Sequence, residues 1–178
     1  MATAIGEGFR GPDGHVGYLL RQAHQAFRAA AQAGLGPLGL TLPQYSVLTV
    51  ADAEPGLSGA ELARDSMLTP QTTNEIISLL VPAGLLERRQ DAGDRRLRRM
   101  FVTEAGRDLL SRARPAVHAV ERRMTASLGG ADQAVLRRWL TDCALNLTPG
   151  PAEPPHGNGN GRQDPRHPLP NHTGDKAP

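Results

Sequence analysis

The stretch of residues 57–103 constrains the fold of this chain more than any other part of its 178 residues. Ser58 followed by Glu61 predicts a capping box, in which the serine hydroxyl caps a short helix and the glutamate caps the serine in return. Thr69 followed by Pro70 marks a second helix start, because threonine is a good cap and proline fits the first turn. The sequence therefore predicts two short helices that are joined by a tight turn.

The second of these helices has one apolar face and one face of short, neutral hydrogen-bonding groups. Its apolar positions recur at three- and four-residue spacing, which predicts a buried stripe of Thr73, Ile76, Ile77, Leu80 and Val81. Its open face carries Gln71, Thr72, Asn74 and Ser78. In the major groove of DNA, Asn and Gln suit adenine, and Ser and Thr adapt to several bases. An ordinary solvated helix also has a polar face, so this helix alone leaves both interpretations open.

An arginine-rich segment follows the second helix. Residues 85–89 and 98–102 are expected to form two strands around a turn, because Met100 and Val102 alternate with Arg99 and Phe101 in the second of them. The segment contains Arg88, Arg89, Arg95, Arg96, Arg98 and Arg99, against the carboxylates of Glu87, Asp91 and Asp94. So many like charges repel one another unless an anion relieves them, and DNA phosphates provide such an anion. The alternative is a solvated charge run with Arg–Asp pairs inside the hairpin.

Two short helices and a charged hairpin together predict a winged helix-turn-helix over about residues 40–103. Apolar stripes at helical spacing flank it over about 15–33 and 104–147, and these helices are expected to pair two copies of the chain. The predicted fold class is therefore mainly α with a small β-hairpin wing, in one domain over residues 15–148.

The two ends of the chain carry no such pattern. Residues 1–14 are rich in glycine and are expected to form a flexible arm. Residues 149–178 change abruptly to Pro, Gly, Asn and His with almost no apolar side chains, so we expect a disordered tail.

Composition narrows the choice of function. Only 3% of residues are aromatic and 39% are hydrophobic, which suits a small helical core, and a net charge of +2 does not by itself indicate a nucleic-acid binder. The single cysteine, Cys143, excludes an internal disulfide and a cysteine-built zinc site. No apolar run could serve as a signal peptide or cross a membrane, so we expect a cytoplasmic protein. We expect no cofactor, no metal and no enzymatic activity, because no paired-carboxylate pocket, nucleophile elbow or phosphate loop occurs in a suitable setting.

Four segments of the sequence resemble the MarR family of bacterial transcriptional regulators, in order and with the spacing of that family. They are LTLPQYSVL, GLSGAELARDSMLTPQTTNEI, LVPAGLLERR and DAGDRRLRRMFVTEAGR. The most specific part is the wing motif, in which an aspartate and an arginine precede a strand and a Thr-x-x-Gly element, here Asp94, Arg96 and Thr103 to Gly106. The resemblance implies a homodimer whose first and last two helices interlock. Such a dimer binds a palindromic operator in double-stranded DNA and usually represses transcription.

The resemblance also assigns roles to individual residues. It implies that Thr69 to Pro82 is the recognition helix, that Asp94 braces the wing, and that Arg95 or Arg96 enters the minor groove. The residues expected to contact or position DNA are Ser58, Thr69, Gln71, Thr72, Asn74, Ser78, Arg88, Asp94, Arg95, Arg96 and Arg98.

One residue departs from the family pattern. Many family members carry an arginine in the recognition helix where this chain has Glu75. A carboxylate near phosphates is unfavourable unless it accepts a hydrogen bond from cytosine or pairs with Arg64 or another arginine. The operator sequence therefore cannot be carried over from the family.

The family often binds small aromatic or phenolic ligands between its dimerisation helices and its DNA-binding part. In this chain the candidates to line such a site are Tyr18, His24, Phe27 and Tyr45, although each is more simply an interface or core residue. We expect a small aromatic effector in this place to release the protein from DNA.

Two alternatives to this interpretation are open. Some proteins of this kind sense oxidants through a thiol, and Cys143 would be the residue concerned. A buried structural thiol is the simpler interpretation, because Cys143 falls on the apolar face of the last helix and no arginine is placed to lower its pKa. The other alternative is a winged helix that only contacts proteins, which leaves the wing arginines unexplained.

Overall fold

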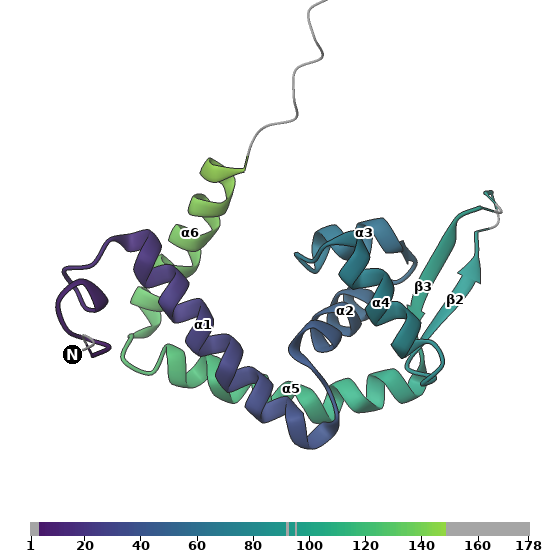
Figure 1. Ribbon diagram of the computed structural model, residues 1–178, viewed down its shortest axis with the longest axis horizontal. Coiled ribbons are helices and arrows are strands. Elements are labelled where there is room, and N and C mark those ends of the chain that lie inside the picture. The colour runs from purple at the N-terminus through teal and green to yellow at the C-terminus, as the bar shows by residue number, and fades with distance from the viewer. Residues whose placement is uncertain (1–3, 92, 95, 149–178) are drawn as a thin grey trace, which may run out of the picture. The chain divides into compact units, whose positions relative to one another are not determined.

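The computed structural model describes residues 4–91, 93–94 and 96–148, and it is mainly helical with one small antiparallel sheet (Figure 1). Its helices and strands, in chain order, are η1 (Gly8–Arg10), α1 (Val16–Leu35), η2 (Gly36–Leu38), α2 (Leu42–Ala53), β1 (Leu57–Ser58), α3 (Gly59–Asp65), α4 (Pro70–Leu80), β2 (Leu86–Gln90), β3 (Arg98–Val102), α5 (Glu104–Met124) and α6 (Gly130–Leu147). The chain divides into two compact units after Gln133, so most of α6 belongs to the second unit.

Both helices of the helix-turn-helix begin at the side-chain caps that the sequence predicted. At the start of α3 the Ser58 hydroxyl accepts from the Glu61 backbone N–H at 3.3 Å, and a Glu61 carboxylate oxygen accepts from the Ser58 N–H at 2.7 Å. At the start of α4 the Thr69 hydroxyl accepts from the Thr72 N–H at 3.1 Å, with Pro70 in the first turn. Each such cap contributes about 1 kcal/mol to stability by satisfying an N–H group that has no partner inside the helix.

The predicted hairpin is confirmed, and β2, β3 and their connecting turn are called the wing below. The short strand β1 was not predicted, since two residues give no periodic signal. It pairs with β3 in an antiparallel register that places Leu57 opposite Met100, so the strand order in the sheet is β1-β3-β2. This third strand ties the wing to the chain segment immediately before α3.

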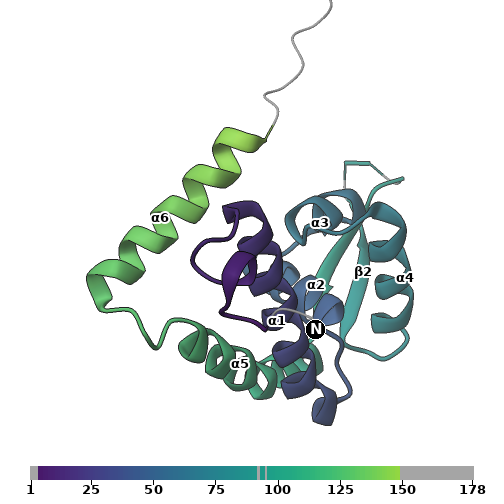
Figure 2. The same ribbon diagram turned by 60° about the vertical axis from the view of Figure 1, so that its left-hand side comes forward.

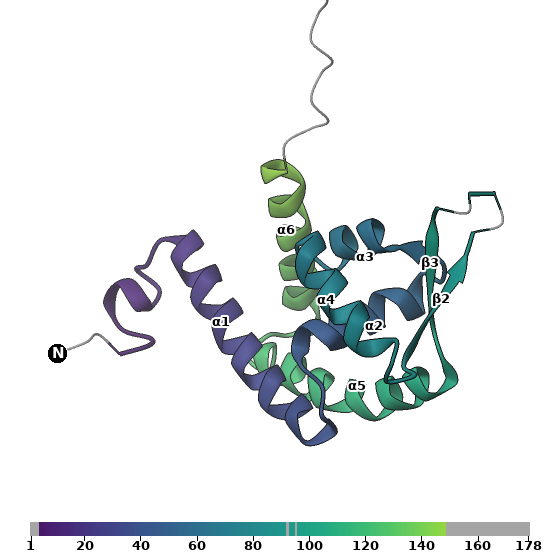
Figure 3. The same cartoon turned by 45° about the vertical axis from the view of Figure 1, so that its right-hand side comes forward.

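The core lies between the helices and one face of the sheet, and the wing stands beside α3 and α4 (Figure 3). Its completely or almost completely buried side chains come from every part of the winged helix and from α5: Leu35, Val47, Leu48, Leu62, Ile77, Leu86 and Leu110. The predicted stripe of α4 is buried at Thr73, Ile76, Ile77 and Leu80 and half-buried at Val81. Burying one such leucine or isoleucine stabilises the fold by about 1.5–3 kcal/mol, so this stripe fixes which face of α4 remains outside.

The predicted extent of the recognition helix is wrong at its C-terminal end. The helix ends at Leu80 rather than at Pro82, and residues 81–84 form a turn that finishes with Gly84 at a φ of 69°. Only glycine adopts such a left-handed conformation without steric cost, so the chain reverses there into β2.

The predicted flexible arm contains local structure in its described part, residues 4–14. Residues Gly8–Arg10 form a turn of 3-10 helix, and the Arg10 side chain donates to the Gln22 side-chain oxygen at 3.2 Å. The Phe9 ring contacts the Tyr18 ring at a centroid distance of 5.5 Å. These contacts fasten the segment to α1, a connection for which the glycine-rich sequence gave no sign. Residues 1–3 and the predicted tail at 149–178 lie outside the described residues.

Helix α6 has no buried side chain. Its large exposed apolar residues are Val135, Trp139, Leu140, Leu145 and Leu147, and Cys143 is half-buried rather than buried. The prediction of a buried thiol is therefore wrong for the single chain, because the apolar face that carries Cys143 remains uncovered. Within the described part of the chain, no helix combines the length and the apolar character needed to cross a membrane.

Candidate nucleic-acid interface

The outward face of α4 brings together most of the residues that the sequence predicted to contact bases. Helix α4 lies at the outside of the winged helix (Figure 2). Its residues Gln71, Asn74 and Ser78 are exposed and recur at helical spacing, and they line one open depression together with Glu75 and Leu79. Thr72 is half-buried and does not line this depression. The exposed surface of α4 is therefore narrow and presents amide, hydroxyl and carboxylate groups.

Two other predicted residues act as caps within the fold. The Ser58 hydroxyl caps α3, as described above, and Ser58 also pairs with Arg99 in the sheet. The Thr69 hydroxyl caps α4 and donates a hydrogen bond to the Thr72 hydroxyl at 2.9 Å. Both residues hold a helix start in place, and of the two only Thr69 is fully exposed at the surface.

The turn of the wing is held by two aspartates. One Asp91 carboxylate oxygen accepts from the backbone N–H groups of Gly93 at 2.8 Å and Asp94 at 3.0 Å. The Asp94 carboxylate accepts from the Arg96 backbone N–H at 2.8 Å. The brace that the sequence assigned to Asp94 alone therefore rests on Asp91 as well. Arg95 lies outside the described residues.

Arg99 fastens the wing to the start of α3. Its guanidinium donates to the second Asp91 carboxylate oxygen at 2.8 Å and to the Gly56 carbonyl at 3.1 Å, and it lies 3.5 Å from a Glu61 carboxylate oxygen. The pKa of Asp91 falls to about 2, mainly because of the hydrogen bond from Arg99 and then because of those from Asp94 and Gly93. Arg99 is a structural cation, since three oxygen groups of the protein already surround it.

Arg89 is also engaged within the protein. It forms an ion pair with Glu87, and its guanidinium lies 4.5 Å from the centre of the Phe101 ring. A cation over an aromatic face contributes roughly 0.5–1 kcal/mol at an exposed site. The predicted alternative of Arg–Asp pairs inside the hairpin is thus correct for Arg99, which pairs with Asp91, whereas Arg89 pairs with a glutamate.

The other described wing arginines have no such partners. Arg88, Arg96 and Arg98 are exposed, and their side chains make no hydrogen bond or ion pair with another described residue. Arg88 lies opposite the buried Met100 in the register, so it shares the face of the sheet that packs on the helices. Arg98 lies two residues before Met100 on the same strand and shares that face, because side chains alternate between the faces of a sheet. Arg88 and Arg98 therefore share the face of the sheet that carries Met100, and the paired Arg89 and Arg99 share the opposite face.

A cavity of about 690 Å³ lies beneath the helix-turn-helix. It is lined by His24, Phe27, Arg28, Leu42, Pro43, Tyr45, Ser46, Thr49, Ser66, Met67, Leu68, Val117, His118 and Glu121, from α1, α2, the turn between α3 and α4, and α5. Two of its hydroxyl oxygens, those of Thr49 and Ser66, are buried and have no hydrogen-bond partner. Unpaired buried hydroxyls are costly, so this cavity has unused capacity to bind a polar group.

The structure places three of the four predicted ligand residues in this cavity. His24, Phe27 and Tyr45 line it, but Tyr18 does not. The prediction for Tyr18 is wrong, because its ring contacts Phe9 and lies 5.8 Å from the Arg21 guanidinium near the start of α1.

This geometry has close counterparts among known proteins. The model of the MarR family matches residues 38–97. An HTH-type transcriptional repressor of Mycobacterium tuberculosis is 38% identical over 128 residues, which are 72% of this chain and 92% of that repressor. The chain belongs to the MarR family. The match covers almost the whole length of this relative, so it extends beyond the winged helix of about residues 40–103.

Solved structures of MarR family members extend this comparison. The M. tuberculosis MarR family protein in complex with salicylic acid has a TM-score of 0.61 and 36% identity, and the match covers 74% of this chain and 98% of that one. The same protein in complex with DNA has a TM-score of 0.60 and 36% identity, again over 74% and 98% of the two chains.

Sequence reasoning missed two residues that organise this MarR family wing. Asp91 and Arg99 were both counted in the charge run, but nothing in their spacing showed that they bond to each other across the hairpin. The register offers a signal in retrospect, because Arg99 lies opposite Arg89 and next to the turn that Asp91 begins. An aspartate at the first position of a turn commonly accepts from the N–H groups that follow it.

The wing brace should respond to acid in a defined pH range. The carboxylate of Asp91 titrates at about 2 in the folded protein, below its ordinary 3.8, so it stabilises the wing fully above that ordinary value. This stabilisation disappears as the pH falls through about 2. NMR titration of the Asp91 carboxyl carbon should give a midpoint near 2, and Arg99→Gln should move it up towards 3.8. A wild-type midpoint near 3.8 would show that the bond from Arg99 does not form in solution.

Proposed function

We propose that this chain is a transcriptional regulator, acting as a repressor, that binds a palindromic DNA site as a homodimer. One observation carries the proposal. The exposed hydrogen-bonding face of α4 and the unpaired Arg88, Arg96 and Arg98 belong to one rigid winged helix. A helix of this width fits the major groove, and arginines beside it can neutralise phosphates or enter the minor groove. Such a regulator acts where the chromosome lies, so we place it in the cytoplasm.

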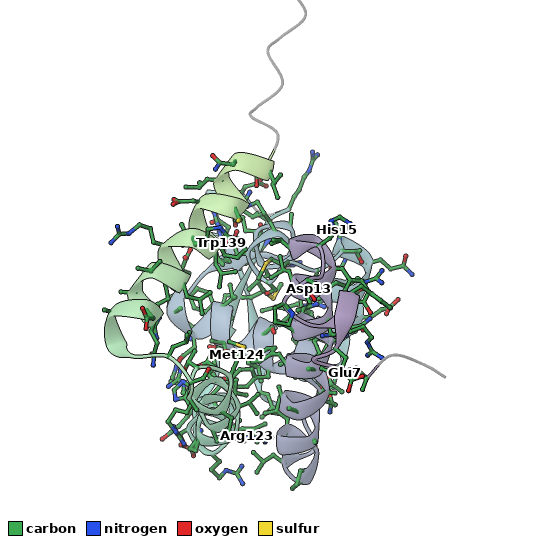
Figure 4. All side chains as sticks on the ribbon, turned by 90° about the vertical axis from the view of Figure 1, so that its left-hand side faces the viewer. Glu7, Asp13, His15, Arg123, Met124 and Trp139 are labelled. Atoms are coloured by element: carbon green, nitrogen blue, oxygen red, sulfur yellow. The ribbon has the colours of Figure 1, made fainter. Side chains whose placement is uncertain are left out.

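The proposed homodimer rests on apolar side chains that a single chain leaves uncovered. Helix α6 exposes five large apolar residues, and Met124 at the end of α5 is 52% exposed. Ala23, Ala26 and Phe27 of α1 line a shallow apolar groove together with Arg123 and Met124 of α5. Figure 4 shows Arg123 and Met124 near the end of α5. Apolar surface of this extent is normally covered by a partner. Two-fold symmetry would then present two copies of α4 to successive major grooves about 34–36 Å apart.

Selection of bound sequences from random DNA, followed by titration at several salt concentrations, tests this function. We expect a palindromic consensus, a complex of two chains per site, and an affinity that falls steeply with salt. Binding without a consensus, or no salt-sensitive binding at all, would favour a winged helix that contacts only proteins.

We further propose that a small aromatic acid binds the cavity beneath the helix-turn-helix and releases the protein from DNA. The relative from M. tuberculosis was solved with salicylic acid, and this cavity offers Arg28 to a carboxylate and the unpaired hydroxyls of Thr49 and Ser66 to a phenol. Ser66 and Met67 belong to the turn that sets α4 against α3. Occupancy of the cavity therefore acts directly on the placement of the DNA-contacting helix.

Thr49→Val offers a clean test of this effector site, because valine has the shape of threonine without the hydroxyl. The free protein should keep its melting temperature or gain slightly, since a buried unpaired hydroxyl is removed. Salicylic acid at about a hundredfold excess over its Kd should raise the wild-type melting temperature by about 5 °C, and the variant should show a clearly smaller rise. Equal rises in both proteins would place the ligand elsewhere.

A further inference from the structure

The exposed face of α4 carries a negative charge and no positive one. The segment Pro70–Leu80 contains no lysine, arginine or histidine, and its one ionisable side chain is Glu75, which is exposed. An arginine in a recognition helix usually binds guanine through O6 and N7, so this helix lacks the commonest means of recognising guanine.

No cation of the described residues neutralises Glu75. Arg64, the nearest candidate from the sequence, pairs with Asp65 at 3.1 Å instead. The Glu75 carboxylate accepts a hydrogen bond from the Gln71 side-chain amide at 3.2 Å, one turn earlier on the same helix face. This bond orients the carboxylate without cancelling its charge, and the second carboxylate oxygen has no partner among the described groups.

Two of the neighbouring side chains on α4 donate hydrogen bonds within the protein. The Ser78 hydroxyl donates to the Asn74 backbone carbonyl at 2.8 Å, and Gln71 donates one amide hydrogen to Glu75. The groups left free around Glu75 include the second N–H of the Gln71 amide and the Asn74 side-chain amide, but the Glu75 carboxylate is the one charged group among them and can only accept. Such a group fits a DNA edge that offers hydrogen-bond donors.

Resting on the proposed DNA-binding function, we propose that Glu75 recognises cytosine by accepting a hydrogen bond from its N4 amino group in the major groove. Guanine offers only the acceptors N7 and O6 there, so a carboxylate repels it. Adenine offers an amino group, but its N7 acceptor lies beside that group and opposes the second carboxylate oxygen. Cytosine presents its amino group in the major groove with no acceptor on the same base. Gln71 is a positioning residue, because it holds the carboxylate through the amide bond described above.

The same arrangement explains how a carboxylate is tolerated near phosphates. Glu75 lowers affinity for every sequence, and the unpaired arginines of the wing offset this with sequence-independent attraction. The carboxylate thus reduces the affinity for most DNA sequences, and this loss is offset only where cytosine supplies a hydrogen-bond donor. An unfavourable contact with other sequences can produce specificity in this way.

The test compares base preferences of the full-length wild type with those of Glu75→Gln and Glu75→Ala, each by selection from random DNA and by titration on the selected site. Asp108→Asn is the matched control, since Asp108 is an exposed carboxylate on α5 and the charge change is the same. We expect one half-site position at which wild type prefers cytosine over the other bases by roughly tenfold. Glu75→Gln should change that preference to adenine, and Glu75→Ala should lose it, while Asp108→Asn keeps it.

Other outcomes overturn the proposal in distinguishable ways. If both Glu75 variants bind all sequences more tightly with unchanged preferences, Glu75 acts only through its charge. If wild type prefers an A·T pair at the position that the variants alter, the acceptor surface is assigned wrongly. If wild type selects no DNA sequence, the proposed function itself fails, and the inference fails with it.

Discussion

Replacing Arg88, Arg96 and Arg98 together with alanine should leave the fold intact and weaken DNA binding by roughly a hundredfold or more at about 0.1 M salt. These side chains are exposed and unpaired among the described residues, so their loss removes attraction to phosphates without breaking a bond inside the protein. In a dimer the change removes about six phosphate contacts, and the slope of log affinity against log salt should become shallower by about 5. Fluorescence-anisotropy titrations on the selected site at several salt concentrations measure both quantities.

Arg89→Ala is the control for this experiment. Arg89 belongs to the same strand as Arg88 and carries the same charge. It pairs with Glu87 and lies over Phe101, on the face of the wing opposite to Arg88. Its removal should change the salt slope by less than one unit per protomer. If Arg89→Ala reduced the slope by as much as one third of the effect of the triple replacement, the distinction between free and internally paired arginines of the wing would be wrong.

Gly106→Ala should cause a large loss of stability for a single added methyl group. A Cβ atom at Gly106 would lie 2.2 Å from the Leu85 carbonyl oxygen and 2.7 Å from a Val102 methyl group. The first of these contacts is with backbone, which cannot move without separating β2 from the start of α5. We expect the free energy of unfolding to fall by about 3 kcal/mol, as measured by chemical denaturation, since overpacking against backbone exceeds the usual cost of an added methylene.

Gly36→Ala provides the comparison for this change. Gly36 has helical backbone angles and no atom within 4 Å of an added Cβ, so alanine should leave stability unchanged or raise it by up to about 1 kcal/mol. A loss for Gly106→Ala no greater than that for Gly36→Ala would mean that the backbone at Leu85 yields easily.

Local signals in the sequence predicted the helix starts well because a cap is a short-range interaction. Ser58, Thr69 and Thr103 each bond to an N–H group two or three residues ahead, so the residue types and their spacing are sufficient. The end of α4 was predicted less well. Pro82 shows that the helix does not continue beyond that residue, but it does not show at which earlier residue the helix ends. Strand β1 escaped prediction because it exists only through its pairing with β3.

The candidate interface was predictable by residue type but not by role. The sequence showed a cluster of arginines. The register of β2 and β3 then placed Arg89 and Arg99, which bond within the protein, on the opposite face from Arg88 and Arg98. Glu75 was recognised as unusual, but its bond to Gln71 and the pairing of Arg64 with Asp65 required coordinates. Tyr18 was assigned to the ligand site from its aromatic character, which carries no information about the direction in which the ring points.

Hydrogen bonds of Thr103 connect three parts of the molecule. The Thr103 hydroxyl accepts from the Gly106 N–H at 3.0 Å and donates to the Gly84 carbonyl at 2.6 Å, and its backbone N–H bonds to the Leu85 carbonyl. These bonds connect the wing, the turn after α4 and the first turn of α5. Because α5 also lines the proposed effector cavity through Val117, we expect a change in the tilt of α5 to shift the wing as well.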